Sequence, residues 1–402
     1  MKKRRGATKG KEPEKSDIPS KPWYKNTMAI VALVSALVAA VTGLIALAQR
    51  LEPAKVAQNT IIVFDRSLAM NGSFEQRTKL EAATEAVDKV LSNEVAGADN
   101  LALRSFGGLC SGENSQIAID FSQHNERRVR DTVRTFQADG ETTLTDAMIE
   151  AIGDFNDPKR FEGVNKRIIV ITGGGDSCQA DPAKYIRNRL ETLHMGEGIT
   201  VSFRFIGMAL DPEQKNQLTA IAEETGGISE ETPDDQVFFV SSQSELEDVL
   251  TQIVGVEPIL NTANSMGNIM NTVTGHVNDA VSAINREDYS AAEEGLQAAK
   301  DEFKNTQLLL TDLGQRLSIP EFHEQLQKLY ELLTENRRLQ EKQLKLLETM
   351  IGQGKSGDTD ARNETIQEWN KIVSEFDSNV IEMDKIIEDI TNRLREQRTP
   401  SS

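Results

Sequence analysis

Residues 60–70 read TIIVFDRSLAM and decide the fold of the middle of the chain. The run TIIVF is β-branched or apolar on both faces, which is typical of a central strand covered by helices on each side. It ends in a polar loop that begins with Asp65. A second run of this kind, RIIVIT at residues 167–172, ends in a glycine-rich loop. Because ligands gather at the carboxyl ends of such strands, both loops are candidate site elements.

Short β-rich runs and amphipathic stretches alternate around these two strands. This rhythm predicts a doubly wound, Rossmann-like open α/β sheet over residues 58–256. The other strand candidates are residues 101–106, 116–121, 199–206 and 237–240. The helix candidates are residues 76–93, 126–135, 143–155, 183–194, 212–225 and 243–254.

Three loops of this domain resemble those of von Willebrand factor type A (VWA) domains. Residues 64–70 (FDRSLAM) are similar to the family's Asp-x-Ser-x-Ser-Met loop, residues 140–148 (GETTLTDAM) to its threonine-bearing loop, and residues 171–178 (ITGGGDSC) to its third loop. The resemblance extends over about half of the chain and implies a VWA fold for that half.

In VWA domains these loops form a metal-ion-dependent adhesion site, where hydroxyls and carboxylates surround Mg²⁺ and a partner's acidic side chain completes the shell. Carried over by position, the resemblance implies Asp65, Ser67 and Thr142 as metal ligands. Asp146 and Asp176 lie nearby in sequence and are candidates for contact with the metal through water. The resemblance also implies a protein partner that binds at Asp65, Ser67, Thr142 and Asp176.

Two ligands of the family pattern are missing, because Ala69 stands for the second serine and Gly173 for the third-loop aspartate. Neither a methyl group nor a hydrogen can coordinate a cation. The site is therefore degenerate, and two interpretations stay open. It holds Mg²⁺ or Ca²⁺ through fewer ligands, since Mg²⁺ is often held by only one or two carboxylates. Alternatively it is free of metal, and Asp65 is a loop carboxylate that accepts backbone N–H bonds.

The chain has two cysteines, Cys110 and Cys178, in loops expected at the same edge of the sheet. The resemblance to VWA domains of bacterial envelope proteins implies that they pair, and an oxidising location favours a disulfide. The alternative is a pair of free, buried thiols.

One segment is long and apolar enough to cross a membrane. Residues 27–48 contain no charge and no proline, and about 20 such residues span the hydrocarbon core of a bilayer. Residues 1–26 carry many more basic than acidic side chains, so this tail is expected in the cytoplasm and the rest outside it, in a single-pass topology. A cleaved signal peptide is the alternative, with Ala46 and Ala48 at the cleavage site.

Residues 259–397 are predicted to form an antiparallel helical bundle or coiled coil. Apolar residues recur three and four positions apart in four seams, separated by breaks at 285–288, 318–320 and 352–359. The third seam is interrupted by Asn336 and Gln340. Either the four helices bury their own seams, or these positions face a partner helix or set the register, with a homo-oligomer as one outcome.

Composition and motifs favour binding over catalysis. The formal charge of −18 opposes nucleic-acid binding, which needs a basic face. The four histidines, His124, His194, His276 and His323, lack metal-ligand spacing, and no phosphate loop or nucleophile motif occurs in the sequence. We therefore expect a protein that is not an enzyme, which is anchored in the membrane and binds protein partners in the cell envelope. The alternative is a scaffold in which the C-terminal helices do the work and the VWA domain is metal-free.

Overall fold

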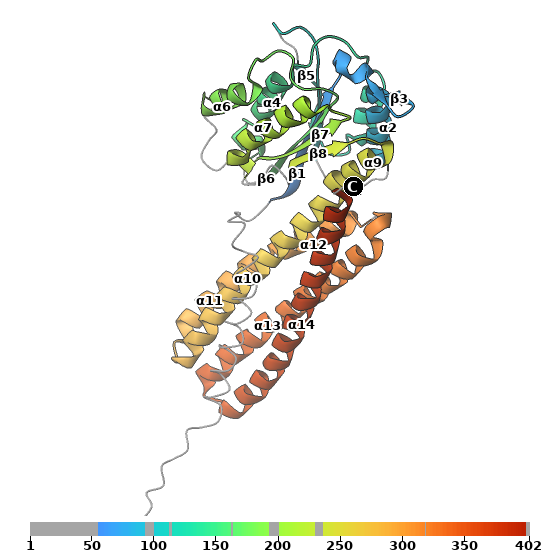
Figure 1. Cartoon of the computed structure of the whole chain (residues 1–402). Helices are drawn as coiled ribbons and strands as arrows, with labels where there is room; N and C mark the ends of the chain where they lie inside the picture. Colours follow the sequence, from blue (N-terminus) through green and yellow to red (C-terminus); the bar gives the residue numbers. More distant parts are fainter. Residues whose placement is uncertain are drawn as a thin grey trace, which may run out of the picture.

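The structure is a computed structural model that describes residues 55–92, 100–111, 115–161, 164–192, 201–229, 236–317 and 319–398. It consists of a sheet-and-helix head and a bundle of long helices below it (Figure 1). The head comprises the elements from β1 to α9, and the bundle those from α10 to α14. No helix within the described ranges is both long and apolar enough to cross a bilayer. The predicted spanning segment, residues 27–48, and the basic tail before it lie outside those ranges.

The head is built on a mixed sheet of six strands in the order β5-β4-β1-β6-β7-β8. Neighbouring strands are parallel except β5, which pairs with β4 in the antiparallel sense. The strands are β1 (Lys55–Asp65), β4 (Asn100–Phe106), β5 (Ser115–Ser122), β6 (Val164–Thr172), β7 (Val201–Met208) and β8 (Val237–Val240). The predicted α/β architecture and its strand positions are confirmed.

Helices cover both faces of the sheet, as the two-sided apolar strands predicted. Ile62 and Phe64 of β1 pack in a core with α2 (Lys79–Ser92), α3 (Glu126–Val133) and α9 (Gln243–Thr251). Ile61 and Val63 point to the other face, which is covered by α4 (Leu144–Gly153), α6 (Pro182–Thr192) and α7 (Pro212–Ser229). Successive side chains of β1 point to opposite faces of the sheet, so this one strand contributes to both cores.

Small elements that the sequence did not predict lie between β1 and α2. These are a 3-10 turn, η2 (Leu68–Asn71), and a short hairpin of β2 (Ser73–Phe74) and β3 (Arg77–Thr78). The helix predicted to begin at residue 76 therefore begins at Lys79. On the other side of the sheet, a single turn, α5 (Pro158–Phe161), precedes β6.

The carboxyl ends of β1, β4 and β6 meet at the end of the head that faces away from the bundle (Figure 1). We call the loops at this end, residues 66–72, 107–111, 139–143 and 173–181, the rim. The loops are bonded to one another: Leu68 N donates to Gly140 O at 2.9 Å, and Glu141 N donates to Gly108 O at 2.6 Å. Gly140 has a φ of +74°, and a Cβ there would lie 2.4 Å from Gly108 Cα, so only glycine permits this approach.

Head and bundle are joined without a loop. α9 runs into a π-helical turn, η3 (Gln252–Val256), which runs directly into α10 (Glu257–Asn285). Pro258 has no N–H to donate to the preceding turn, so the helix lacks one backbone hydrogen bond at this point. All five residues of η3 are buried. The sequence predicted a domain boundary here from the change in composition. The backbone nevertheless stays helical across it.

Two arginines of the sheet hold this junction. Arg167 of β6, 1% exposed, donates through Nη1 to the carbonyl of Ile253 in η3. Arg204 of β7 donates through Nε to Glu257 Oε2 at 2.8 Å, and both side chains are largely buried. Strands β6 and β7 are thus both tied to the start of the bundle.

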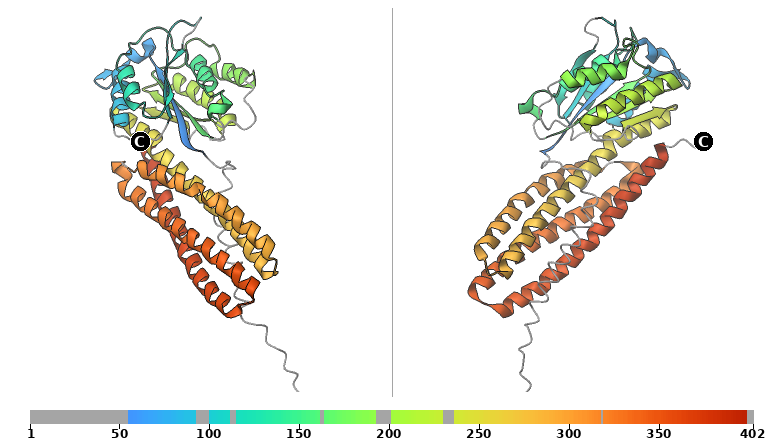
Figure 2. Two further views of the ribbon diagram at one scale, coloured as in Figure 1. Left: turned by 180° about the vertical axis from the view of Figure 1, so that it is seen from behind. Right: turned by 60° about the vertical axis from the view of Figure 1, so that its left-hand side comes forward.

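The bundle consists of long antiparallel helices, with the pair α10 and α11 beside the pair α13 and α14 (Figures 1 and 2). Its further elements are α11 (Tyr289–Phe303), α12 (Asn305–Gln315), a 3-10 turn η4 (Pro320–Phe322), α13 (His323–Ser356) and α14 (Thr359–Arg398). The break predicted at residues 352–359 is shorter than expected. α13 continues to Ser356 and stops at Gly357, whose left-handed φ of +71° ends the helix.

The polar interruption of the third seam lies inside the bundle. Asn336 and Gln340 are each 0% exposed. Asn336 Oδ1 accepts from Asn379 Nδ2 of α14 at 2.9 Å, and Gln340 Nε2 donates to Met270 O of α10 at 2.8 Å. The bundle's own helices therefore cover both positions that had been considered for a partner helix.

Candidate functional site

Asp65 ends β1 and is completely buried at the base of the rim. Its Oδ1 accepts from Ser67 N at 2.7 Å, and its Oδ2 accepts from Thr172 Oγ1 at 2.9 Å and Gly173 N at 3.0 Å. Burial raises the pKa of Asp65, and the hydrogen bonds from Ser67, Gly173 and Thr172, which lower it, offset this rise only in part. Each of these groups donates to the carboxylate, which favours its charged form. The backbone bonds are those of the metal-free interpretation.

Ser67 and Thr142 lie side by side, as the resemblance predicted. Their hydroxyl oxygens are 2.9 Å apart, and both residues are buried. Two oxygens at neighbouring corners of an octahedron around Mg²⁺ lie about 3.0 Å apart when each metal–oxygen distance is about 2.1 Å. The two hydroxyls therefore have the spacing of a metal-ligand pair, although here they bond to each other.

Lys79, the first residue of α2, extends its side chain to the loops around Asp65. Its side chain is buried, and Nζ donates to Gly173 O at 2.7 Å and to Ala209 O at 3.2 Å. Burial lowers the pKa of Lys79, and the negative charges of Asp65 and Asp211, which raise it, offset this only in part. Sequence reasoning missed this residue. The available signal was its position on the apolar stripe of its helix, in line with Ala82, Ala83 and Ala86.

The two aspartates considered as water-mediated ligands are engaged elsewhere. Asp176 Oδ2 accepts from Thr145 N and Thr145 Oγ1, both at 2.8 Å. Its Oδ1 accepts from Cys178 N and Gln179 N, both at 2.9 Å. Asp146 Oδ1 accepts from Tyr185 OH at 2.7 Å. Asp176 thus holds the third loop against the start of α4, and Asp146 holds α4 against α6.

These residues do not fit a divalent cation well. Asp65 is the only carboxylate that the resemblance assigns as a direct metal ligand. Both of its oxygens already accept hydrogen bonds from the protein. The Lys79 ammonium supplies positive charge near Asp65. Within the residues that the structure describes, no three His, Cys, Asp or Glu side chains are grouped as a metal site requires. The hydroxyl spacing alone is favourable, and we derive no role for a metal from it.

A disulfide closes one side of the rim. Cys110, in the loop after β4, is bonded to Cys178, in the third loop, with their Cα atoms 5.2 Å apart. The predicted pairing is confirmed. The bridge joins loops that are 68 residues apart in sequence, so it constrains the rim covalently.

The exposed part of the rim differs from the residues predicted to bind a partner. Asp65, Ser67, Thr142 and Asp176 are each at most 6% exposed. The exposed large apolar side chains of the rim are Leu68, 55% exposed in the first loop, and Leu109, 72% exposed next to the disulfide. The polar cluster therefore shapes the rim, while leucines form part of its outer surface.

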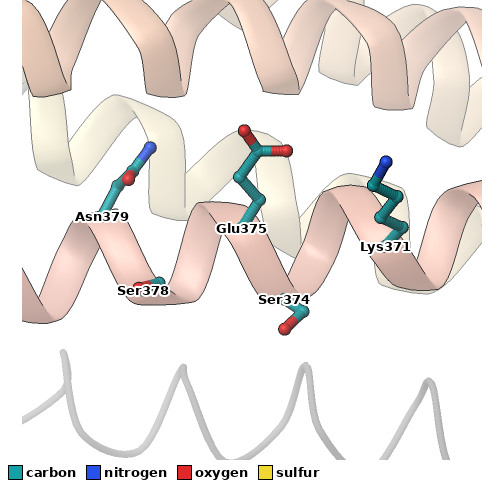
Figure 3. Close-up of a pocket in the computed structure, with 5 residues that line it drawn as sticks. All are labelled: Lys371, Ser374, Glu375, Ser378 and Asn379. Atoms are coloured by element: carbon teal, nitrogen blue, oxygen red, sulfur yellow. The ribbon is translucent and has the colours of Figure 1, made fainter.

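A pocket on the bundle is a weaker candidate. It is lined by Lys371, Ser374, Glu375, Ser378 and Asn379, all on α14. Figure 3 shows Lys371, Glu375 and Asn379 on one side of the helix and the two serines on another. Polar groups from different elements do not converge there, as they do in most ligand sites.

Comparison with known families agrees with the fold and the loops. Residues 60–175 match the model of the von Willebrand factor type A domain. This range runs from β1 to the third loop and includes Asp65, Ser67 and Thr142. The head therefore contains a VWA domain, as the three loops predicted.

Solved structures with similar folds match about half of this chain. The SpRpn10 VWA domain is 14% identical, with 48% of this chain and 94% of that one covered and a TM-score of 0.35. The pilus adhesin SpaC from Lactobacillus rhamnosus GG is 13% identical, with 51% and 30% covered and a TM-score of 0.38. The PilB minor pilin from Streptococcus sanguinis is 11% identical, with 49% and 60% covered and a TM-score of 0.38. No curated protein matches the chain.

Proposed function

We propose that this chain is a membrane-anchored protein whose VWA head binds a protein partner outside the cytoplasm, without catalysing a reaction. The observation that carries the proposal is the exposure of Leu68 and Leu109 on loops that are held by hydrogen bonds and a disulfide. Exposed large apolar side chains on an ordered surface are available to contact a protein partner, and contiguous apolar patches mark such sites. The rim also faces away from the bundle, so a partner can approach it freely (Figure 1).

The proposed location rests on two features. Residues 27–48 form an uncharged apolar segment after a basic tail, which favours an anchor with the head exported. The Cys110–Cys178 disulfide supports an oxidising compartment, because such bonds are rare in the cytosol.

The location is tested by trapping free thiols in living cells with a membrane-permeant alkylating reagent before lysis. An exported head has both cysteines in the bridge, so neither is modified until a reductant is added. Modification of Cys110 and Cys178 in untreated cells would place the head in a reducing compartment and contradict this part of the proposal.

The binding surface is tested with matched leucine variants. We expect Leu68→Ser and Leu109→Ser each to weaken the complex isolated from native membranes by at least about tenfold, which corresponds to about 1.4 kcal/mol. The control is Leu308→Ser on α12, where the side chain is 60% exposed and remote from the rim. It should leave the complex intact.

A second candidate function assigns the binding to the bundle and makes the head a spacer. It is favoured by two exposed apolar side chains there, Leu308 and Ile381, which are 60% and 55% exposed. It predicts the opposite outcome: Leu308→Ser or Ile381→Ser weakens the complex, and the rim variants have no effect. Self-association of the full chain that is lost with Ile381→Ser would identify the partner as a second copy.

A further inference from the structure

The side chain of Lys79 occupies a passage that two glycines leave open. A Cβ added at Gly72 would lie 3.2 Å from Lys79 Cε, and one added at Gly173 would lie 3.0 Å from Lys79 Cδ. The same added Cβ at Gly173 would be 2.6 Å from Met70 Sδ. An aspartate at position 173 would therefore displace the side chains of Lys79 and Met70 from their places in this arrangement.

The end of the passage is built to receive an ammonium group. Gly173 O follows β6 and Ala209 O follows β7, and both accept from Lys79 Nζ. Ala209 holds a φ of +43°, a region in which residues other than glycine are strained by about 1 kcal/mol. The strained residue is thus one that supplies a carbonyl to the lysine.

Lys79 brings a positive charge to this point, and Gly173 links it to Asp65: Gly173 O accepts from Lys79 Nζ, and Gly173 N donates to Asp65 Oδ2. The carboxylate of Asp65 is buried, and its attraction acts on Lys79 from within the loop cluster. A buried carboxylate without a positive neighbour is costly, and a lysine on a fixed stem offsets that cost without any bound ion. A divalent cation placed at the hydroxyl pair would add two positive charges to a cluster that already holds the Lys79 ammonium.

We propose that the Lys79 ammonium takes the place of a divalent cation in the loop cluster, so that the rim keeps its folded form without metal. Ala69, Gly173 and Lys79 are then one set of mutually compensating residues. Of the two positions that depart from the VWA ligand pattern, Gly173 lies against the Lys79 side chain, and a Cβ added at Gly173 would lie 3.3 Å from the carbonyl oxygen of Ala69.

The first test is a titration of the full chain with Mg²⁺, Ca²⁺ and Mn²⁺ by calorimetry, together with melting in the presence and absence of EDTA. We expect no saturable heat and no change in melting temperature. Saturable binding of any of the three ions, with a fall in melting temperature when EDTA removes it, would overturn the proposal. This measurement needs no variant.

The second test is a double-mutant cycle between Lys79→Met and Asp65→Asn. Methionine fills the passage without charge, so Lys79→Met leaves the Asp65 carboxylate uncompensated and should lower the melting temperature by about 10 °C. In the Asp65→Asn background the same change should cost much less. Additive shifts would show that the two groups do not act on each other and would contradict the proposal.

Lys166 provides a matched control for the cycle. It is a second buried lysine of the head, 8% exposed in β6, and burial alone lowers its pKa. Lys166→Met and Asp65→Asn should therefore give additive shifts. Coupling of equal size for Lys166 and Lys79 would mean that the effect is not specific to the loop cluster, which would also count against the proposal.

Discussion

The Nε atom of Arg204 lies 2.8 Å from the Oε2 atom of Glu257, and this pair ties strand β7 to the first residue of α10. The exposures of the two side chains are 9% and 12%, so little water screens the interaction. A buried pair that loses one partner leaves the other charge uncompensated. The contact therefore makes the stability of the head depend on the presence of the bundle's first turn.

We expect Arg204→Met to lower the free energy of unfolding of the full chain by about 3 kcal/mol, because Glu257 then stays buried without this partner. Chemical denaturation followed by circular dichroism measures the change. The control is Arg187→Met. Arg187 pairs with Glu224, and its side chain is 56% exposed. Exposed pairs contribute about 0–1 kcal/mol, and a loss as large as that of Arg204→Met would contradict the role given to burial.

Reduction of the Cys110–Cys178 bridge should destabilise the head. A closed loop with a separation of 68 residues stabilises the folded state by about 4 kcal/mol in the chain-entropy account. The exposed Cys110 makes the bond accessible to a reductant. Melting with and without dithiothreitol measures the effect, and a double Cys→Ser variant that does not respond to the reductant is the control. Equal melting temperatures for the oxidised and reduced chain would refute the prediction.

Asn336→Leu should stabilise the bundle. Within the described part of the chain, Asn336 Nδ2 has no hydrogen-bond partner, although the side chain is 0% exposed. Leucine removes this unsatisfied donor and adds apolar contact, which we expect to raise the free energy of unfolding by about 1 kcal/mol. Asn379, its partner, lines the pocket on α14 and can bond to water instead (Figure 3).

The comparison variant is Asn336→Asp, which places a carboxylate at the same buried position. It should destabilise the bundle by at least as much as leucine stabilises it. A loss of stability with Asn336→Leu would indicate that the Asn336–Asn379 bond is worth more than the unsatisfied donor costs.

The acid side of the stability profile should depend on Asp88. Burial by itself raises the pKa of Asp88, but hydrogen bonds and charges from Arg130 and Arg134 outweigh it and lower the pKa below that of the unfolded chain. Stability from a carboxyl with a lowered pKa is fully present above its unfolded pKa of about 3.9 and is lost as the pH falls through the folded value. The chain should therefore lose this contribution below about pH 4.

Asp88→Asn tests this dependence. The variant should be less stable than the parent at pH 7, and the difference should shrink as the pH falls below about 4. Urea unfolding at a series of pH values measures it. A difference that stays constant down to pH 2 would show that Asp88 does not titrate as its contacts with α3 require.

The strands were predicted closely because their signal is local. The run at residues 60–64 is apolar on both faces, and it lies within β1, between two helical layers. The seam at 263–284 is buried, and the seam at 366–394 is buried or half-buried, for the same reason: a period near 3.6 can be recognised in consecutive residues. The loop resemblance likewise brought Asp65, Ser67 and Thr142 together.

The missed features depend on partners far away in sequence. Lys79 contacts Gly173 and Ala209, which are 94 and 130 positions away, and nothing in the helix alone shows that a passage exists for it. Asn336 and Gln340 interrupt their seam, and their partners Asn379 and Met270 lie on other helices. The continuity of η3 with α10 was missed because a proline and a change of composition normally mark a boundary.

The helical path from α9 through η3 into α10 has no flexible loop between the head and the bundle. With 29 residues, α10 is about 44 Å long, so a rigid helix sets the position of the head relative to the far end of the bundle. One residue inserted into α10 would turn the head by about 100° and lengthen the helix by only about 1.5 Å. The number of residues between β8 and the end of α10 therefore determines the direction in which Leu68 and Leu109 of the rim point.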